Sequence, residues 1–128
     1  MRATYEGDPQ ALFDDVISHL RKQKIKSYQS PIGCLYRGSN GLKCAIGGIL
    51  PDELYFPEME GGSIIRFTQF ADSQGEYIEK AKKIGQFIGV ENTKLAQDLQ
   101  SLHDNYPALL EEEAIRIAKK HNLKYTSP

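Results

Sequence analysis

The chain has 128 residues, enough for one domain with a single hydrophobic core, and we expect residues 1–128 to form it, with residues 1–7 and 124–128 frayed. An apolar fraction of 40%, a charged fraction of 26% and a formal net charge of -1 are typical of a globular protein and exclude a disordered or fibrous one. The balanced charge also argues against a general nucleic-acid binder, which needs a basic surface.

No stretch of about 18 apolar residues is present, so the sequence predicts no membrane span and no membrane partner. The N-terminal sequence MRATYEGDPQ lacks the apolar core of a signal peptide, which favours a cytoplasmic location. In that compartment the two cysteines are expected to be thiols.

The first predicted element is a helix that begins at Pro9 and fades by Lys24. Asp8 suits the N-cap, and proline suits the first helical position. Apolar residues recur at three- and four-residue spacing and predict one buried stripe. These residues are Leu12, Phe13, Val16, Ile17 and Leu20.

A β-hairpin is predicted next, from residues 34–37 and 42–46 around the turn Gly38-Ser39-Asn40-Gly41. A three-residue loop would place Cys34 opposite Cys44 on one face, whereas an even-length loop would place them on opposite faces. The sequence therefore leaves open whether the two thiols meet. The exposed edge of this hairpin could pair across a two-fold axis, so a homo-oligomer is also left open.

Glycines and prolines punctuate the region that follows. Gly47 and Gly48 predict a tight bend or a close backbone approach. Residues 50–55 (LPDELY) predict a short helical turn that ends at Phe56-Pro57. Residues 64–70 are apolar without one clear period, which fits either a short helix or an extended segment.

Three more helices are predicted in the C-terminal half. The first begins near Asp72 or Ser73 and stops at Gly89; the second begins at Asn92 or Thr93 and carries His103 on its apolar stripe. The third begins at Pro107, and Asn122 is its left-handed cap. The sequence therefore predicts an α+β fold, with four main helices packed around one core, a small β-hairpin and an irregular loop region.

The string CLYRGSNGLKCAIGGILPDELYFPEMEG, followed by LAQDLQSLHD, resembles a family of small uncharacterised proteins of phages, prophages and bacterial genomes. The resemblance covers about the middle and C-terminal two-thirds of the chain. It departs at Gly48 and in residues 63–90. The matching residues are Cys34, Tyr36, Gly41, Lys43, Cys44, Ala45, Gly47, Pro51, Asp52, Glu53, Tyr55, Met59, Glu60, Gly61, Leu99, Gln100, His103 and Asp104. No activity is established for that family, so the resemblance implies a phage-associated accessory protein and no particular reaction.

The candidate catalytic residues are Cys44, His103 and Asp104, with Asp52 as an alternative acid. A thiol nucleophile needs a base within hydrogen-bond reach and a group that orients this base. His103 and Asp104 are adjacent on a predicted helix, so their side chains diverge by about 100° and do not form an orienting pair. The simpler interpretation is that Cys44 is an inert buried thiol.

A metal site is disfavoured, because zinc sites in small domains usually contain closely spaced ligand pairs. Cys34, Cys44 and His103 could supply three ligands, but their spacing is wide. No phosphate-binding loop or cofactor motif is present either. We therefore predict no metal and no cofactor. His19 and His121 are expected at helix surfaces or ends, as exposed or capping groups.

The candidate binding residues are Tyr36, Asp52, Glu53, Tyr55 and Glu60. The carboxylates could hold a cation or a basic partner, but Asp52 and Glu53 also suit the start of a helical turn, and Glu60 could bond loop amides. The aromatic residues could form a partner-binding patch or pack the loop onto the helices. Both interpretations stay open at this point.

The sequence thus favours a non-enzymatic accessory protein that binds and modulates a host macromolecule, most simply a host protein in the host cell cytoplasm. Inhibition of a host defence system is one concrete form of this hypothesis. The alternative is a small enzyme or ligand-binding protein that uses the neighbourhood of Cys44, His103 and Asp52. The two differ in whether Cys44 and His103 meet at a concave site.

Overall fold

The computed structural model describes residues 3–23, 28–29, 33–34, 36, 43–60, 78–104 and 108–128. The main elements of this part are four α-helices: α1 (Pro9–Gln23), α3 (Ile78–Ile88), α4 (Thr93–Gln100) and α5 (Leu110–Lys120). Short 3-10 helices connect or extend them: η2 (Asp52–Leu54), η3 (Pro57–Met59), η5 (Val90–Asn92) and η6 (Ser101–Asp104). Two strands, β1 (Tyr28–Gln29) and β2 (Gly33–Cys34), pair in antiparallel fashion.

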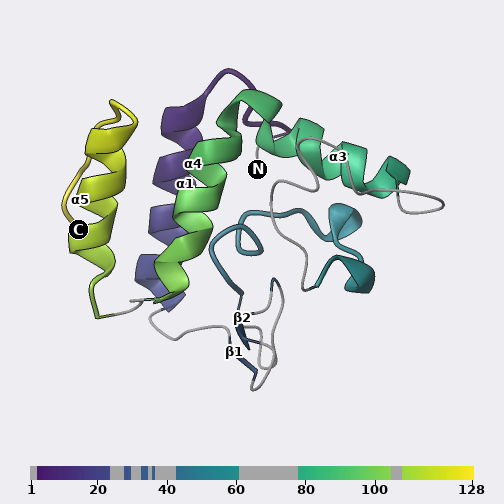
Figure 1. The fold of residues 1–128 in the computed structure, drawn as a ribbon, viewed down its shortest axis with the longest axis horizontal. Coiled ribbons are helices and arrows are strands. Elements are labelled where there is room, and N and C mark those ends of the chain that lie inside the picture. Colours follow the sequence, from purple (N-terminus) through teal and green to yellow (C-terminus); the bar gives the residue numbers. More distant parts are fainter. Residues whose placement is uncertain are drawn as a thin grey trace.

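Helices α1, α4 and α5 contact one another and form a three-helix bundle, and α3 lies on the side of α1 and α4 that faces away from α5 (Figure 1). The loop of residues 43–60 lies beside α4 and packs against α3 through η2. All four helices and this loop contribute to one core. Its largest fully buried side chains are Leu12, Phe13, Val16, Ile46, Ile84, Ile88, Leu99 and Ile117.

The first helix is confirmed in detail. Its N-cap Asp8 accepts a hydrogen bond from the Ala11 amide at 3.1 Å, and the helix ends at Gln23. The predicted apolar stripe, Leu12, Phe13, Val16, Ile17 and Leu20, is buried. Burial of such a stripe, rather than intrinsic propensity, supplies most of the stability of a helix of this length.

The predicted α+β class and its β-hairpin are wrong, because the described part of the chain is helical. Residues 43–44 form no strand, and Ala45–Ile49 form a turn. Cys34 pairs with Tyr28 rather than with a residue of the 42–46 segment. The two strands β1 and β2 have only two residues each, so they provide no sheet layer for the core. Residues 37–42 lie outside the described residues.

The reason is that helix side chains take the backbone groups that a strand ladder would need. Gln23 of α1 accepts from the Lys43 amide at 2.8 Å and donates to its carbonyl at 2.7 Å. Gln100 of α4 accepts from the Ile46 amide at 3.1 Å. Buried backbone groups must find a partner of some kind, and these partners lie on helices far away in the sequence. A local alternation of apolar residues does not reveal them.

The N-terminal residues contact the junction between α3 and α4. The Tyr5 amide donates to the Phe87 carbonyl at 2.7 Å, and the two rings meet edge to face with centroids 5.3 Å apart. The side-chain nitrogen Nδ2 of Asn92 donates to the backbone carbonyls of Tyr5 and Ile88, each at 2.9 Å. Asn92 is 3% exposed, so its side chain stabilises this junction instead of capping α4.

The remaining helix ends agree with the sequence where the structure describes them. Gly89 ends α3, as predicted, with a positive φ of 92°, and Asn122 follows α5 with φ 57°, the left-handed cap that was predicted. The predicted helix starts at Asp72 or Ser73 and at Pro107, and the apolar residues 64–70, lie outside the described residues. No helix among the described residues has the length and apolar character needed to cross a membrane.

Candidate functional site

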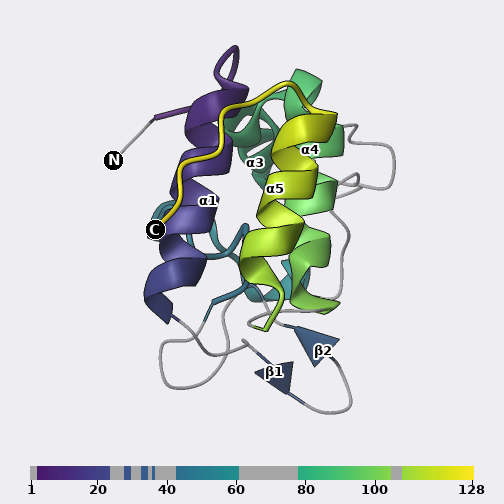
Figure 2. The same cartoon turned by 90° about the vertical axis from the view of Figure 1, so that its left-hand side faces the viewer.

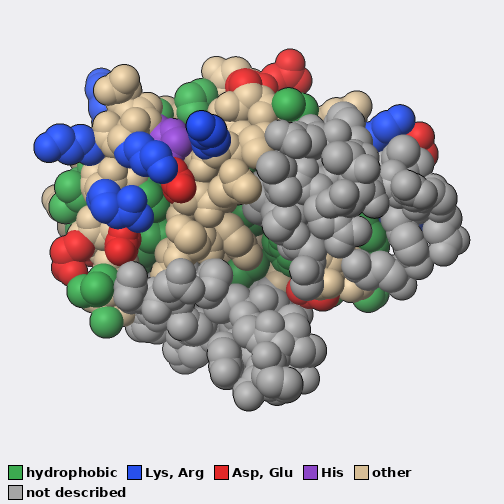
Figure 3. Space-filling view, viewed as in Figure 1, with side chains coloured by type: hydrophobic (Ala, Val, Ile, Leu, Met, Phe, Trp, Pro, Cys, Tyr) green, Lys and Arg blue, Asp and Glu red, His purple; other side chains and the backbone are tan. Residues whose placement is uncertain are grey.

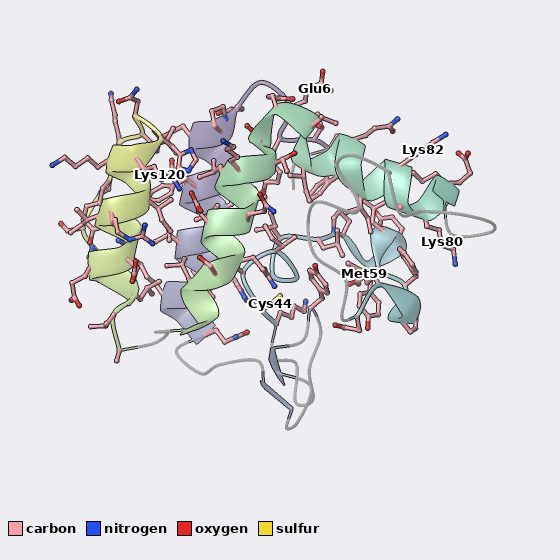
Figure 4. The ribbon with its side chains drawn as sticks, in the orientation of Figure 1. Glu6, Cys44, Met59, Lys80, Lys82 and Lys120 are labelled. Atoms are coloured by element: carbon pink, nitrogen blue, oxygen red, sulfur yellow. The ribbon has the colours of Figure 1, made fainter. Side chains whose placement is uncertain are left out.

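Cys44 directly precedes the turn of residues 45–49 and lies beside α4, as Figure 4 shows. Cys44 is 4% exposed and is a free cysteine. The side-chain amide of Gln100 donates to its sulfur at 3.0 Å, while the amide oxygen accepts from the Ile46 backbone. Gln100 thus holds this segment by both ends of its amide, and the bond that it gives the thiol comes from a neutral group.

His19 holds the same turn from α1. Its Nε2 lies 3.1 Å from the Lys43 carbonyl oxygen, which can only accept, so Nε2 carries a hydrogen. Burial lowers the pKa of His19, and the Lys43 ammonium lowers it further. The carbonyls of Lys43 and Cys44 act in the opposite direction and only partly offset burial. His19 is therefore a neutral structural contact, not the exposed or capping group that was expected.

Gly47 and Gly48 are glycines because of space, not because of backbone angle. A Cβ on Gly47 would lie 1.9 Å from the Tyr36 carbonyl oxygen, and a Cβ on Gly48 would lie 2.2 Å from the His19 ring. Neither glycine has positive φ. The predicted close backbone approach is confirmed.

Glu60 connects Tyr55 of the loop with Tyr36, which precedes the loop in the chain. Its carboxylate accepts from the Tyr36 amide at 2.9 Å and from the Tyr55 hydroxyl at 2.9 Å. The expectation that Glu60 bonds a loop amide is met by Tyr36, which lies 24 residues away. Glu60 therefore fixes the loop rather than presenting a free carboxylate to a ligand.

The other candidate binding residues lie at the surface or in the core, according to their type. Asp52 and Glu53 form the exposed first turn of η2. The aromatic ring of Tyr55 is partly buried, whereas Tyr36, Phe56 and Met59 are 4%, 6% and 2% exposed. The Lys80 ammonium of α3 lies 5.4 Å from the centroid of the Phe56 ring. The aromatic residues of the loop thus pack it onto the helices.

His103 and Asp104 lie in η6, which directly continues α4. Their side chains fall outside the described part, so no contact with Cys44 or Asp52 can be assigned. The described residues that the structure brings to Cys44 are Gln100 and the turn itself, and those brought to the turn from α1 are His19 and Gln23. Gln100 belongs to the pattern of the resemblance; no sequence signal pointed to His19 or Gln23.

An open hollow of about 480 Å³ lies beside His19. Asp15, Ser18 and Lys22 of α1 line it with Tyr5 and the Gly48–Ile49 backbone. Tyr5 donates to the Asp15 carboxylate at 2.6 Å. Enclosed pockets that bury most of a ligand are the usual sites of small molecules. This hollow is open to solvent, and no set of three or more His, Cys, Asp or Glu side chains in the described ranges is placed to hold a metal ion.

Basic side chains gather over α4 and α5 in Figure 3. Acidic groups interrupt them, because Lys120 lies 3.0 Å from Asp98 and Arg116 lies 2.6 Å from Glu113. Burial raises the pKa of Asp98, but hydrogen bonds from His121 and Lys120 outweigh it and lower that pKa overall. This face is therefore a mixed-charge surface, unlike the continuous basic track that phosphates require.

Comparison of the chain with protein-family models, with curated proteins and with solved structures found no match.

We predict that Gly48→Ala destabilises the protein by about 2 kcal/mol, the usual cost of overpacking, because the new methyl group meets the His19 ring. His19→Ala removes the ring that the new methyl group would meet, so Gly48→Ala should lower the free energy of unfolding less in that background. Gly47→Ala is the matched control: its methyl group meets the Tyr36 backbone, which His19→Ala leaves in place. Urea unfolding of the single and double variants measures the coupling. Equal costs of Gly48→Ala in both backgrounds would contradict this packing.

A second prediction concerns pH. Because the pKa of His19 is lowered in the folded state, the unfolded chain takes up a proton first as pH falls below about 6.5. The stabilisation from a neutral His19 is therefore complete above that pH and is lost as pH falls toward the folded pKa. His19→Gln keeps a donor for the Lys43 carbonyl and cannot titrate. Urea midpoints at pH 7.5 and 5.5 should fall more in the native chain than in His19→Gln, and parallel falls would refute the assignment.

Proposed function

We propose that this chain is a non-enzymatic, phage- or prophage-associated accessory protein that binds a host protein in the host cytoplasm and modulates it. Inhibition of a host defence system is the concrete form that we favour. The resemblance supports the association with phages. The geometry around Cys44 supports binding rather than catalysis.

The enclosure of Cys44 is the observation that carries this proposal. A nucleophilic thiol must be reached by its substrate and must give its proton to a nearby base. Cys44 is 4% exposed, and Gln100, a described residue that bonds its sulfur, contributes an amide that does not accept a proton at neutral pH. Gln100 also bonds the Ile46 backbone, so it cannot swing away without leaving a buried amide without a partner.

The alternative, an enzyme or ligand-binding protein built on Cys44, His103 and Asp52, has less support. Asp52 lies on the exposed turn of η2, whereas Cys44 lies inside the core. The hollow beside His19 is open, and its polar lining already contains the bond between Tyr5 and Asp15. These features suit a surface that contacts a macromolecule better than a site that encloses a substrate.

Thiol labelling separates the two functions. In a Cys34→Ser background Cys44 is the one cysteine of the chain. We expect this variant to react with an aromatic disulfide reagent at least a hundredfold more slowly when native than in denaturant, because the sulfur is covered. Gln100→Ala should speed the native reaction. Rapid labelling of the native protein would contradict the enclosure of Cys44 and would favour the alternative, in which Cys44 is a nucleophile.

Capture of a partner tests binding itself. The tagged protein, exposed to host lysate, should retain one protein in stoichiometric amount. The Gly47→Ala variant serves as a bait whose fold is weakened and should retain much less. If the native chain retains no stoichiometric partner, the proposed function is wrong.

A further inference from the structure

The last residues of the chain lie extended between α1 and α5. Figure 2 shows this tail leaving the end of α5 and running back along α1. Leu123 and Tyr125 pack against the core, while Lys124 and Thr126 are exposed. This is the alternation of a β-strand, although the partners of the tail are helix side chains. We call Gln10 and Arg21 of α1 and Glu111 of α5 the tail-binding site.

Gln10 recognises the main chain of the tail. Its Nε2 donates to the Lys124 carbonyl at 2.9 Å, and its Oε1 accepts from the Lys124 amide at 2.8 Å. Arg21 donates to the Thr126 carbonyl at 2.7 Å. A neighbouring β-strand would make the same kind of bonds, which do not depend on the identity of the residue at 124 or 126. The tail-binding site therefore accepts an extended backbone of almost any sequence at those positions.

The side chain at position 125 is read more specifically. The Tyr125 hydroxyl donates to Glu111, and the Arg21 guanidinium lies 5.6 Å from the centroid of the ring. Arg21 is itself fixed by two hydrogen bonds to Glu111, of 2.7 and 3.0 Å. The bond to Glu111 raises the pKa of Tyr125, which keeps the phenol protonated as a donor. A phenylalanine would keep the ring contact and lose this bond.

The main-chain contacts of the tail are weak enough to exchange. The bonds of Lys124 to Gln10 and of Thr126 to Arg21 are exposed to solvent, so water replaces them at little cost. The tail competes with any external segment at an effective concentration on the order of millimolar. A segment with the same features and additional contacts elsewhere on the surface overcomes that competition.

We propose that the tail-binding site is an exchangeable peptide-binding site. The tail of the chain occupies it in the free protein. In the complex it takes an extended segment of the partner protein with an apolar residue and, two positions later, a tyrosine. This assignment rests on the proposed function, in which the chain binds a host protein, and it names the surface and the segment that are recognised.

The test uses the full chain and an acetylated peptide with the sequence of residues 121–128. Tyr125→Ala weakens the hold on the tail and leaves the tail-binding site intact. We expect Tyr125→Ala to bind the peptide at least tenfold more tightly than the native chain, because the competing tail is weakened. Binding is followed by the NMR signal of the Gln10 side-chain amide. In Tyr125→Ala this signal should shift from its native position, and addition of the peptide should return it there. Tyr125→Phe, which keeps the packed ring, is the substitute should Tyr125→Ala fail to fold, with a gain of about threefold.

Two further variants control the site. Adding Gln10→Ala to Tyr125→Ala should weaken peptide binding at least tenfold, whereas adding Gln97→Ala, which removes an exposed glutamine of α4, should not change it. A peptide with phenylalanine in place of the tyrosine should bind more weakly. Absence of saturable binding, or equal binding with and without Gln10→Ala, would overturn the proposal. So would a dimer of the native chain that Tyr125→Ala abolishes, because the occupant would then be a second copy.

Capture from lysate distinguishes this proposal from the proposed function. If the native chain and Gln10→Ala retain a partner equally, the protein binds a host protein as proposed, but the tail-binding site is not part of the interface. If the peptide binds specifically but no partner is retained from lysate, the tail-binding site binds peptides and the proposed function is wrong.

Discussion

Buried backbone groups need partners, and in residues 43–46 side chains of α1 and α4 supply several of them. Gln23 bonds both backbone groups of Lys43, and Gln100 bonds the Ile46 amide. His19 adds a contact to the Lys43 carbonyl and fills the space beside Gly48. This arrangement fixes the loop against the helices without a sheet. These bonds position Cys44, the buried aromatic residues and the hollow beside His19.

The same arrangement changes the meaning of the residues that carry the family resemblance. Cys44 and Gln100 bond each other, and Glu60 bonds the Tyr36 amide and the Tyr55 hydroxyl. Each of these polar groups has a partner inside the protein, which accounts for its presence through packing. Function is therefore better sought where polar groups bond a segment that can leave. The tail, whose backbone is held by Gln10 and Arg21 at the surface, is such a segment.

Much of the helical part could be predicted from the sequence, because its signals are local. The apolar stripe of α1, its Asp8 cap, the stop of α3 at Gly89 and the left-handed cap Asn122 could all be predicted from neighbouring residues. The β-hairpin could not be predicted correctly. Residues 42–46 have the apolar alternation of a strand, but the backbone amides of Lys43 and Ile46 bond side chains 20 and 54 residues away. The candidate site was predicted only in part: Cys44 was identified, but no local pattern indicates that Gln100 would be the group at its sulfur.

The sequence by itself determined the apolar stripe of α1, its Asp8 cap, and the ends of α3 and α5 at Gly89 and Asn122. Those features follow from periodicity and from the backbone preferences of single residues. Only the tertiary structure decided that the turn is held by helices, that Cys44 is covered and that the tail lies between α1 and α5. Those features depend on contacts between distant residues, such as Gln10 with Lys124, 114 positions apart. A side-chain amide can bond almost any backbone group, so its partner is set by where packing places it.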